Sequence, residues 1–143
     1  MIEIKSKIGN KTLHKVYKAS DFTDERTELV DADNFIQCAY LKMGKGKTFR
    51  PHRHIWKSLN YKRVIAQESW VVIRGSVKVF FYDIDGTLLD THILNAGDSS
   101  FTLEGGHTYE ILEDGTLVYE YKTGPYEGQK LDKKFLEDEH DKQ

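Results

Sequence analysis

With 143 residues, 38% of them hydrophobic and 12% aromatic, the chain is long enough for one domain with a substantial core, and its composition excludes a disordered protein. The 21 basic and 23 acidic residues nearly cancel, which excludes the strongly basic surface of a nucleic-acid-binding protein. No apolar run reaches the roughly 18 residues of a membrane-spanning helix, and the lone cysteine, Cys38, favours the reducing cytoplasm.

Strand signals dominate the chain, and helical periodicity is weak. Segments rich in β-branched or aromatic residues alternate with Gly, Asn and Asp turns, in chain order at 35–43, 69–75, 77–84, 90–94, 99–103, 107–112 and 117–122. This spacing predicts an all-β fold, an antiparallel sandwich or barrel, in a single domain over 1–143 with its core at about 35–124. After the last strand, KLDKKFLEDEHDKQ predicts a short helix or a loose tail, with 138–143 mobile.

The stretch VFFYDIDGTLLDT, residues 79–91, resembles the nucleophile motif of haloacid-dehalogenase-type phosphatases. That resemblance implies that Asp83 attacks phosphorus and that Asp85 acts as acid and base beside Mg²⁺. Such enzymes need a parallel sheet with crossover helices, whereas only short strands follow Asp83 here. We therefore interpret the stretch as a β-hairpin that turns at Asp85 and Gly86.

Three histidines and one glutamate have the residue types and spacing of a metal centre. His52 and His54 are two residues apart, so on a strand their side chains point to the same face. Glu68 opens the next predicted strand, and His107 opens another. Three imidazoles and a carboxylate suit one divalent transition metal, Zn²⁺, Fe²⁺, Mn²⁺, Ni²⁺ or Co²⁺. From spacing alone, a pair of surface histidines is the alternative.

The same residues resemble the two sequence motifs of the cupin superfamily. The first motif matches at Gly46, His52, His54, Glu68 and Gly75, and the second at Gly97, Asp98, Gly105 and His107. The resemblance implies an antiparallel jelly-roll barrel of the RmlC-like type, with His52, His54, Glu68 and His107 as metal ligands. Between His54 and Glu68 the chain has thirteen residues, 55–67, more than the family usually has.

Within that superfamily, the segments RPHRH and YEYKTGPY resemble the WbuC-like cupin metalloproteins. This closer resemblance implies a cytoplasmic protein of surface-polysaccharide biosynthesis that acts on a small polar molecule, such as a sugar or sugar-nucleotide derivative. The resemblance to small cupins also implies a homodimer. Neither resemblance indicates the reaction, which leaves isomerisation, hydrolysis and dioxygen chemistry open.

Aromatic and cationic side chains around the predicted metal are candidates for the ligand site. Alternation along the strands places Trp70 on the face of Glu68 and Tyr109 on the face of His107, and Tyr109 and Glu68 are the catalytic candidates. The candidates for substrate binding are Arg50, Lys57, Trp70, Tyr119 and Tyr121. The basic stretch that holds Arg50 and Lys57 suits an anionic substrate, or is an inert surface loop. The aromatic residues suit a small-molecule pocket, or are simply core.

Two other functions compete with a metal-dependent enzyme. One is a metal-independent sugar-nucleotide epimerase or isomerase, with His52 or His54 as base and Tyr109 as acid. The other is a non-catalytic protein that uses the same pocket to bind a small molecule. Activity that survives chelation of metals distinguishes the first of these from the metal enzyme.

Overall fold

The structure, a computed structural model, describes residues 1–56 and 64–136. Nearly all regular structure in these ranges is antiparallel β-sheet. The strands are β1 (Ile2–Lys5), β2 (Thr12–Tyr17), β3 (Arg26–Glu28), β4 (Ala39–Leu41), β5 (Glu68–Arg74), β6 (Ser76–Tyr82), β7 (Leu88–Asn95), β8 (Ser99–Thr102), β9 (Gly106–Ile111) and β10 (Leu117–Lys122), joined by a 3₁₀ turn (Ala19–Asp21) and followed by α1 (Gln129–Asp132). Neither helix of the described ranges has the length and apolar composition needed to cross a bilayer.

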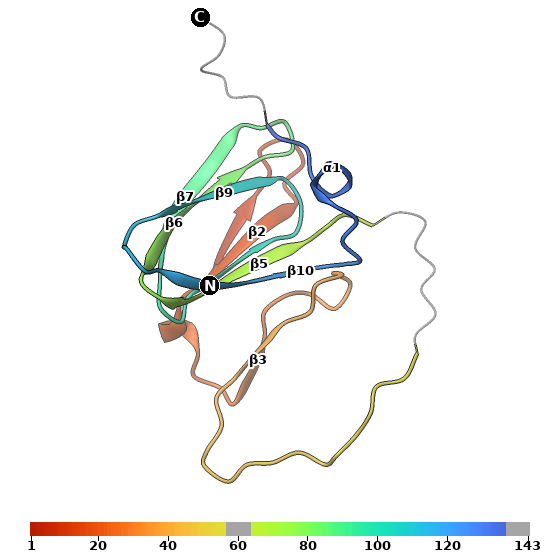
Figure 1. The fold of residues 1–143 in the computed structure, drawn as a ribbon, viewed down its shortest axis with the longest axis vertical. Helices are drawn as coiled ribbons and strands as arrows, with labels where there is room; N and C mark the ends of the chain where they lie inside the picture. Colours follow the sequence, from red (N-terminus) through yellow and green to blue (C-terminus); the bar gives the residue numbers. More distant parts are fainter. Residues whose placement is uncertain (57–63, 137–143) are drawn as a thin grey trace, which may run out of the picture.

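The strands form two larger sheets and a small hairpin (Figure 1). The first sheet has the order β1-β2-β8-β5-β10, the second has the order β7-β6-β9, and β3 pairs with β4. The predicted all-β antiparallel fold and the short C-terminal helix are confirmed. No sheet of the described residues closes on itself, so the jelly-roll barrel stays a prediction. The segment expected to be mobile, 138–143, lies outside the described residues.

The strand predictions hold best in the second half of the chain, where segments rich in β-branched and aromatic residues alternate regularly with turn residues. The six predicted strands from 69 onward correspond to β5 to β10, with shifts of at most two residues at their ends. The predicted strand 35–43 shortens to β4, Ala39–Leu41, and β1 and β2 were not predicted. Pairing with β8 stabilises β2. The short, partly charged N-terminal sequence does not indicate a strand by itself, because that pairing partner is distant in the sequence.

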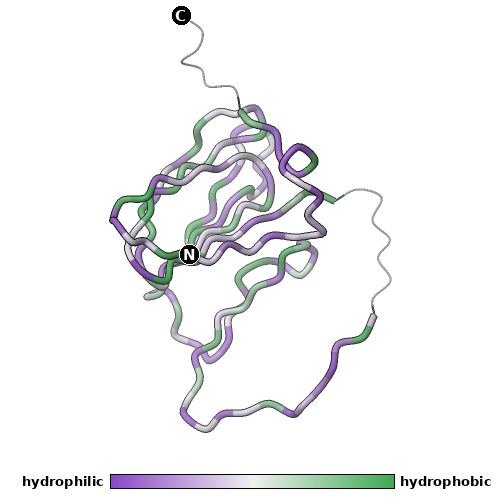
Figure 2. Tube along the Cα trace, viewed as in Figure 1, coloured by the Kyte–Doolittle hydropathy of each residue, from purple (hydrophilic) through white to green (hydrophobic). Residues whose placement is uncertain are grey.

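The core lies between the two larger sheets because alternate residues of each point inward. Val16 and Val72 come from the first sheet, Val79 and Phe81 come from the second, and all four are fully buried. The outer face of the first sheet is covered by the segment around β3 and β4, where Phe22 and Leu29 pack against Phe101 in a second cluster. Figure 2 shows the corresponding mixture of hydrophobic and hydrophilic residues along the strands.

The stretch DIDG forms the predicted hairpin turn between β6 and β7. The Asp83 amide donates to the Thr87 carbonyl at 2.8 Å, and the Gly86 amide donates to the Asp83 carbonyl at 3.0 Å. The Asp83 side chain is buried, and its carboxylate accepts hydrogen bonds from the amides of Ile84 and, across the fold, Lys7. Burial raises the pKa of this carboxyl, but hydrogen bonds from the Ser6 hydroxyl and from backbone amides, those of Ile84 and Lys7 among them, outweigh it and lower the pKa overall. Asp83 thus fastens the N-terminal β1–β2 turn.

Candidate functional site

Glu68 and His107 meet where the two larger sheets approach each other at one end. Glu68 is the first residue of β5 and faces Lys122, the last residue of β10. His107 is the second residue of β9, in the other sheet. Its Nε2 atom lies 2.9 Å from Oε1 of Glu68, and the two side chains are 22% and 14% exposed. We call this region, where β5 and β9 begin and β10 ends, the Glu68 end (Figure 1).

The environment of Glu68 keeps its carboxyl group ionised. Burial raises the pKa of this group, but the hydrogen bond and charge of His107 and the nearby ammonium groups of Lys133 and Lys122 lower it, and the pKa is lowered overall. A carboxylate that stays charged near neutral pH accepts hydrogen bonds and binds cations. It does not serve as a proton donor in that pH range.

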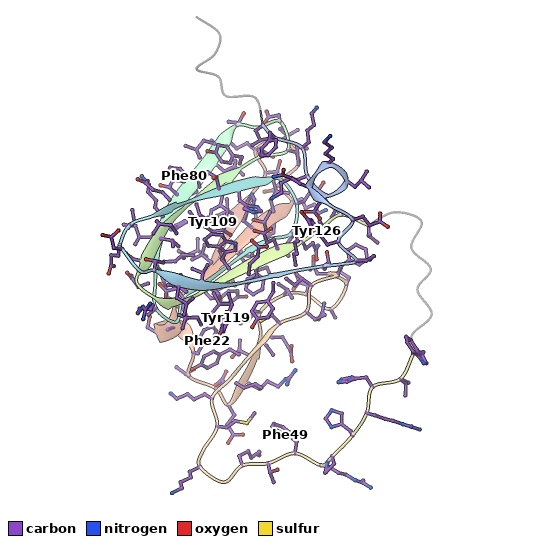
Figure 3. All side chains as sticks on the ribbon, in the orientation of Figure 1. Phe22, Phe49, Phe80, Tyr109, Tyr119 and Tyr126 are labelled. Carbon is purple, nitrogen blue, oxygen red and sulfur yellow. The ribbon has the colours of Figure 1, made fainter. Side chains whose placement is uncertain are left out.

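An aromatic pair lies directly behind Glu68 and His107. The ring of Trp70 stacks on that of Tyr109 with centroids 3.7 Å apart and planes inclined by 3°. Trp70 donates to Glu120 at 3.2 Å, and the Tyr109 hydroxyl shares a hydrogen bond of 3.1 Å with Ser100. Figure 3 shows Tyr109 between the two sheets. Both rings point between the sheets, on the faces that alternation assigned to Glu68 and His107, and both also pack against the hydrophobic core.

Burial also sets the protonation of Tyr109. It raises the pKa of the phenol well above its usual range, and the hydrogen bond with Ser100 only partly opposes this shift. The hydroxyl is therefore neutral at physiological pH. The ring centroids of Tyr109 and His107 are 5.4 Å apart, so the two rings are close neighbours.

The segment with the other two predicted ligands lies apart from the Glu68 end. His52 and His54 occupy an exposed stretch that forms no strand, with their ring centroids 5.4 Å apart. His52 Nδ1 lies 3.0 Å from the carbonyl oxygen of Arg50, which is exposed in the same stretch. Within 1–56 and 64–136, no three His, Cys, Asp or Glu side chains are grouped so that they could hold a metal ion. The four-ligand centre stays a prediction.

The remaining predicted ligand-binding residues are not gathered at the Glu68 end. Tyr119 and Tyr121 share a face of β10, as predicted, but they are 53% and 56% exposed on the face opposite Val118, which packs in the core. Their neighbour Glu120 is on the opposite face, where its exposed carboxylate accepts a hydrogen bond from Trp70. Lys57 lies outside the described residues.

Residues after β10 contribute to the site, which the sequence analysis missed. The Lys122 ammonium pairs with the Asp132 carboxylate at 3.0 Å, and Lys133 lies close enough to Glu68 to lower its pKa. Leu136 packs at Gly106, beside His107. The only sequence signal was the alternating charge in KLDKK, which by itself indicates an exposed helix face.

Comparisons of the chain with protein families, curated proteins and solved structures found no match. The candidate site is therefore defined by its own geometry: a histidine–carboxylate pair between two sheets, backed by stacked aromatic rings.

Proposed function

We propose that the chain binds one divalent transition metal through Glu68, His107, His52 and His54, and acts as a metal-dependent enzyme on a small polar molecule such as a sugar or sugar-nucleotide derivative. The observation that carries the proposal is the 2.9 Å contact between His107 and Glu68, which come from different sheets. Both side chains are partly buried and direct a nitrogen and an oxygen to one place. Imidazole and carboxylate are common ligands of these metals, so the pair fits half of the centre.

The other half requires the segment around His52 and His54 to reach β9. Among the described residues, β9 pairs with β6 on one side only, which leaves its other edge free to accept a strand. Phe49, Ile55 and Trp56 are 59%, 80% and 102% exposed, and such large apolar side chains in one short stretch indicate a surface that packs elsewhere. We infer that residues 47–55 add to this edge of β9, with His52 and His54 on its inner face.

Each residue of the site has a task in this proposal. A metal bound there would polarise a carbonyl group or activate water or dioxygen. Glu68 and His107 hold the metal, and the stacked rings of Trp70 and Tyr109 form an apolar wall that excludes water from one side. The neutral hydroxyl of Tyr109 donates a hydrogen bond to a substrate oxygen. Isomerisation, hydrolysis and dioxygen chemistry are all compatible with these roles.

The test is the metal content of the purified full-length chain after loading with Zn²⁺ or Co²⁺ and dialysis. We expect about one ion per wild-type chain. We expect the metal content to be at least about tenfold lower in each of His52→Ala, His54→Ala and His107→Ala. His92→Ala is the matched control, because His92 lies on β7 and pairs with Asp90 at 3.0 Å. Less than about a tenth of an ion in the loaded wild-type chain contradicts the proposal.

One observation favours a metal-independent isomerase or epimerase instead. A histidine held by a carboxylate is the usual arrangement of a general base, and His107 with Glu68 has it without a metal. Tyr109 is then the proton donor, a task that its raised pKa makes slow. Turnover that survives chelation and is lost in Tyr109→Phe selects this function.

Ligand binding without turnover, in both the metal-loaded and the chelated chain, selects the non-catalytic alternative. The homodimer stays a prediction, which sedimentation tests.

A further inference from the structure

The chain after β10 returns across the Glu68 end. Residues 124–136, which we call the strap, include α1, and Figure 1 shows α1 beside the start of β9. Leu136 reaches Gly106, the first residue of β9: a Cβ atom at Gly106 would lie 2.7 Å from Cδ1 of Leu136. A side chain at Gly106 would therefore require Leu136 to move from this position. The strap thus lies against the strand end that carries His107.

A single ion pair joins the strap to β10 at the same place. Lys122 Nζ lies 3.0 Å from Asp132 Oδ2, with the two side chains 21% and 13% exposed. The Lys122 ammonium also lies 4.1 Å from the centre of the Tyr126 ring, within the strap. Because Lys122 is the strand partner of Glu68, this pair lies next to the candidate site.

Other contacts of the strap are few. Leu131 and Phe135 are 76% and 72% exposed, and α1 has no buried residue. Gly128 has φ of +100°, a backbone conformation that favours glycine, and a Cβ there would meet no atom within 4 Å. A segment with little buried apolar surface and an unconfined glycine opens without disturbing the sheets.

We propose that the strap is a cover for the Glu68 end, that the Lys122–Asp132 ion pair latches it closed, and that it opens by rotation at Gly128. In the closed position it lies over Glu68 and His107. In the open position it uncovers Glu68 and His107 and increases solvent access to the Trp70–Tyr109 stack behind them. The cover goes beyond the proposed metal chemistry. It does not depend on that chemistry, because the contacts that hold it closed are formed between residues of the chain without a metal.

The test uses acrylamide quenching of Trp70 fluorescence in the metal-free, full-length chain. The chain has two tryptophans, so a Trp56→Phe background leaves Trp70 as the only one. We expect Asp132→Asn to raise the quenching constant at least about twofold, because release of the latch increases the open population. Asp114→Asn is the matched control, since it removes the same charge from the exposed β9–β10 turn. Equal quenching constants in Asp132→Asn and Asp114→Asn overturn the proposal.

The opposite side of the latch gives a second, independent measurement. Lys122→Met is expected to reproduce the rise, whereas Lys130→Met, on the exposed side of α1, leaves the quenching constant unchanged. The double variant Lys122→Met/Asp132→Asn is expected to quench no more than either single variant, because each alone already breaks the pair. Additive increases overturn the latch. Circular dichroism confirms that each variant is folded. Metal content is measured separately, so failure of the metal proposal leaves this result standing, and the reverse also holds.

Discussion

Nε2 of His107 lies 2.9 Å from Oε1 of Glu68, although the two residues are 39 positions apart and belong to different sheets. The contact joins the sheets at one end and directs two metal-binding groups to one place. Its effect on stability is measurable in the metal-free chain, separately from any activity.

Glu68→Gln is expected to lower the free energy of unfolding by about 1 kcal/mol, because a neutral amide is a weaker acceptor for His107 than a carboxylate. Urea denaturation of the metal-free chain at neutral pH measures this change. Glu110→Gln is the control, since Glu110 is exposed on the same strand as His107. Equal stability of the two variants would show that the Glu68–His107 contact contributes nothing to folding.

Gly105→Ala is expected to destabilise the fold severely, by at least about 3 kcal/mol. Gly105 has φ of +81°, and an added Cβ would lie 2.5 Å from the Tyr82 carbonyl oxygen and 3.2 Å from His14 Nε2. Gly115→Ala is the matched control because Gly115 has φ of +71° but only one atom within 4 Å, at 3.9 Å. That variant is expected to lose about 1 kcal/mol from backbone strain alone. Thermal unfolding of both variants separates the free-energy cost of the steric clash at Gly105 from the cost of the backbone conformation.

His14 is expected to make the fold sensitive to mild acid. It is fully buried, with Nε2 3.0 Å from the Tyr82 carbonyl oxygen, and burial lowers its pKa from 6.5 to about 4. The unfolded chain therefore binds a proton below pH 6.5 that the folded chain refuses until about pH 4. The contribution of His14 is present above pH 6.5, and about 3 kcal/mol is lost as the pH falls from 6.5 to 4.

Urea denaturation between pH 4 and 7.5 tests the role of His14. We expect a flatter pH dependence in His14→Gln, which keeps an amide donor for the Tyr82 carbonyl but does not titrate. His92→Gln is the control, because the side chain of His92 on β7 is more accessible than that of His14. This variant is expected to retain the wild-type slope. An unchanged slope in His14→Gln would assign the acid sensitivity to other groups.

Asp83→Asn is expected to lower the melting temperature clearly more than Asp85→Asn. The buried Asp83 carboxylate accepts the amide hydrogen bonds of Lys7 and Ile84, so an amide in its place aims a donor at other donors. Asp85 is exposed and accepts a single local bond from the Thr87 amide. Loss of a Mg²⁺-dependent phosphatase turnover in Asp83→Asn, with stability unchanged, would instead support the phosphatase resemblance of this stretch.

Local sequence patterns predicted the elements well where the pattern alone decides the structure. Segments rich in β-branched and aromatic residues, separated by Gly, Asn and Asp turns, predicted β5 to β10 because such side chains favour strands and such turn residues end them. The Asp-Gly dipeptide after β6 predicted the hairpin because glycine at position 86, with φ of +87°, readily adopts the conformation that the turn needs. Strands β1 and β2 were not predicted, because their burial depends on β8, which lies more than 80 residues away in the sequence.

The sequence by itself determined which residues share a face: Glu68 with Trp70, His107 with Tyr109, and Tyr119 with Tyr121. Only the tertiary structure decided which face is which, since alternation has the same period whether a face turns toward a core or toward water. Packing of one sheet on the other turned Trp70 and Tyr109 inward and Tyr119 and Tyr121 outward. The same packing brought Glu68 to His107 and the strap to both, because contacts between distant segments depend on how whole sheets stack rather than on any local spacing.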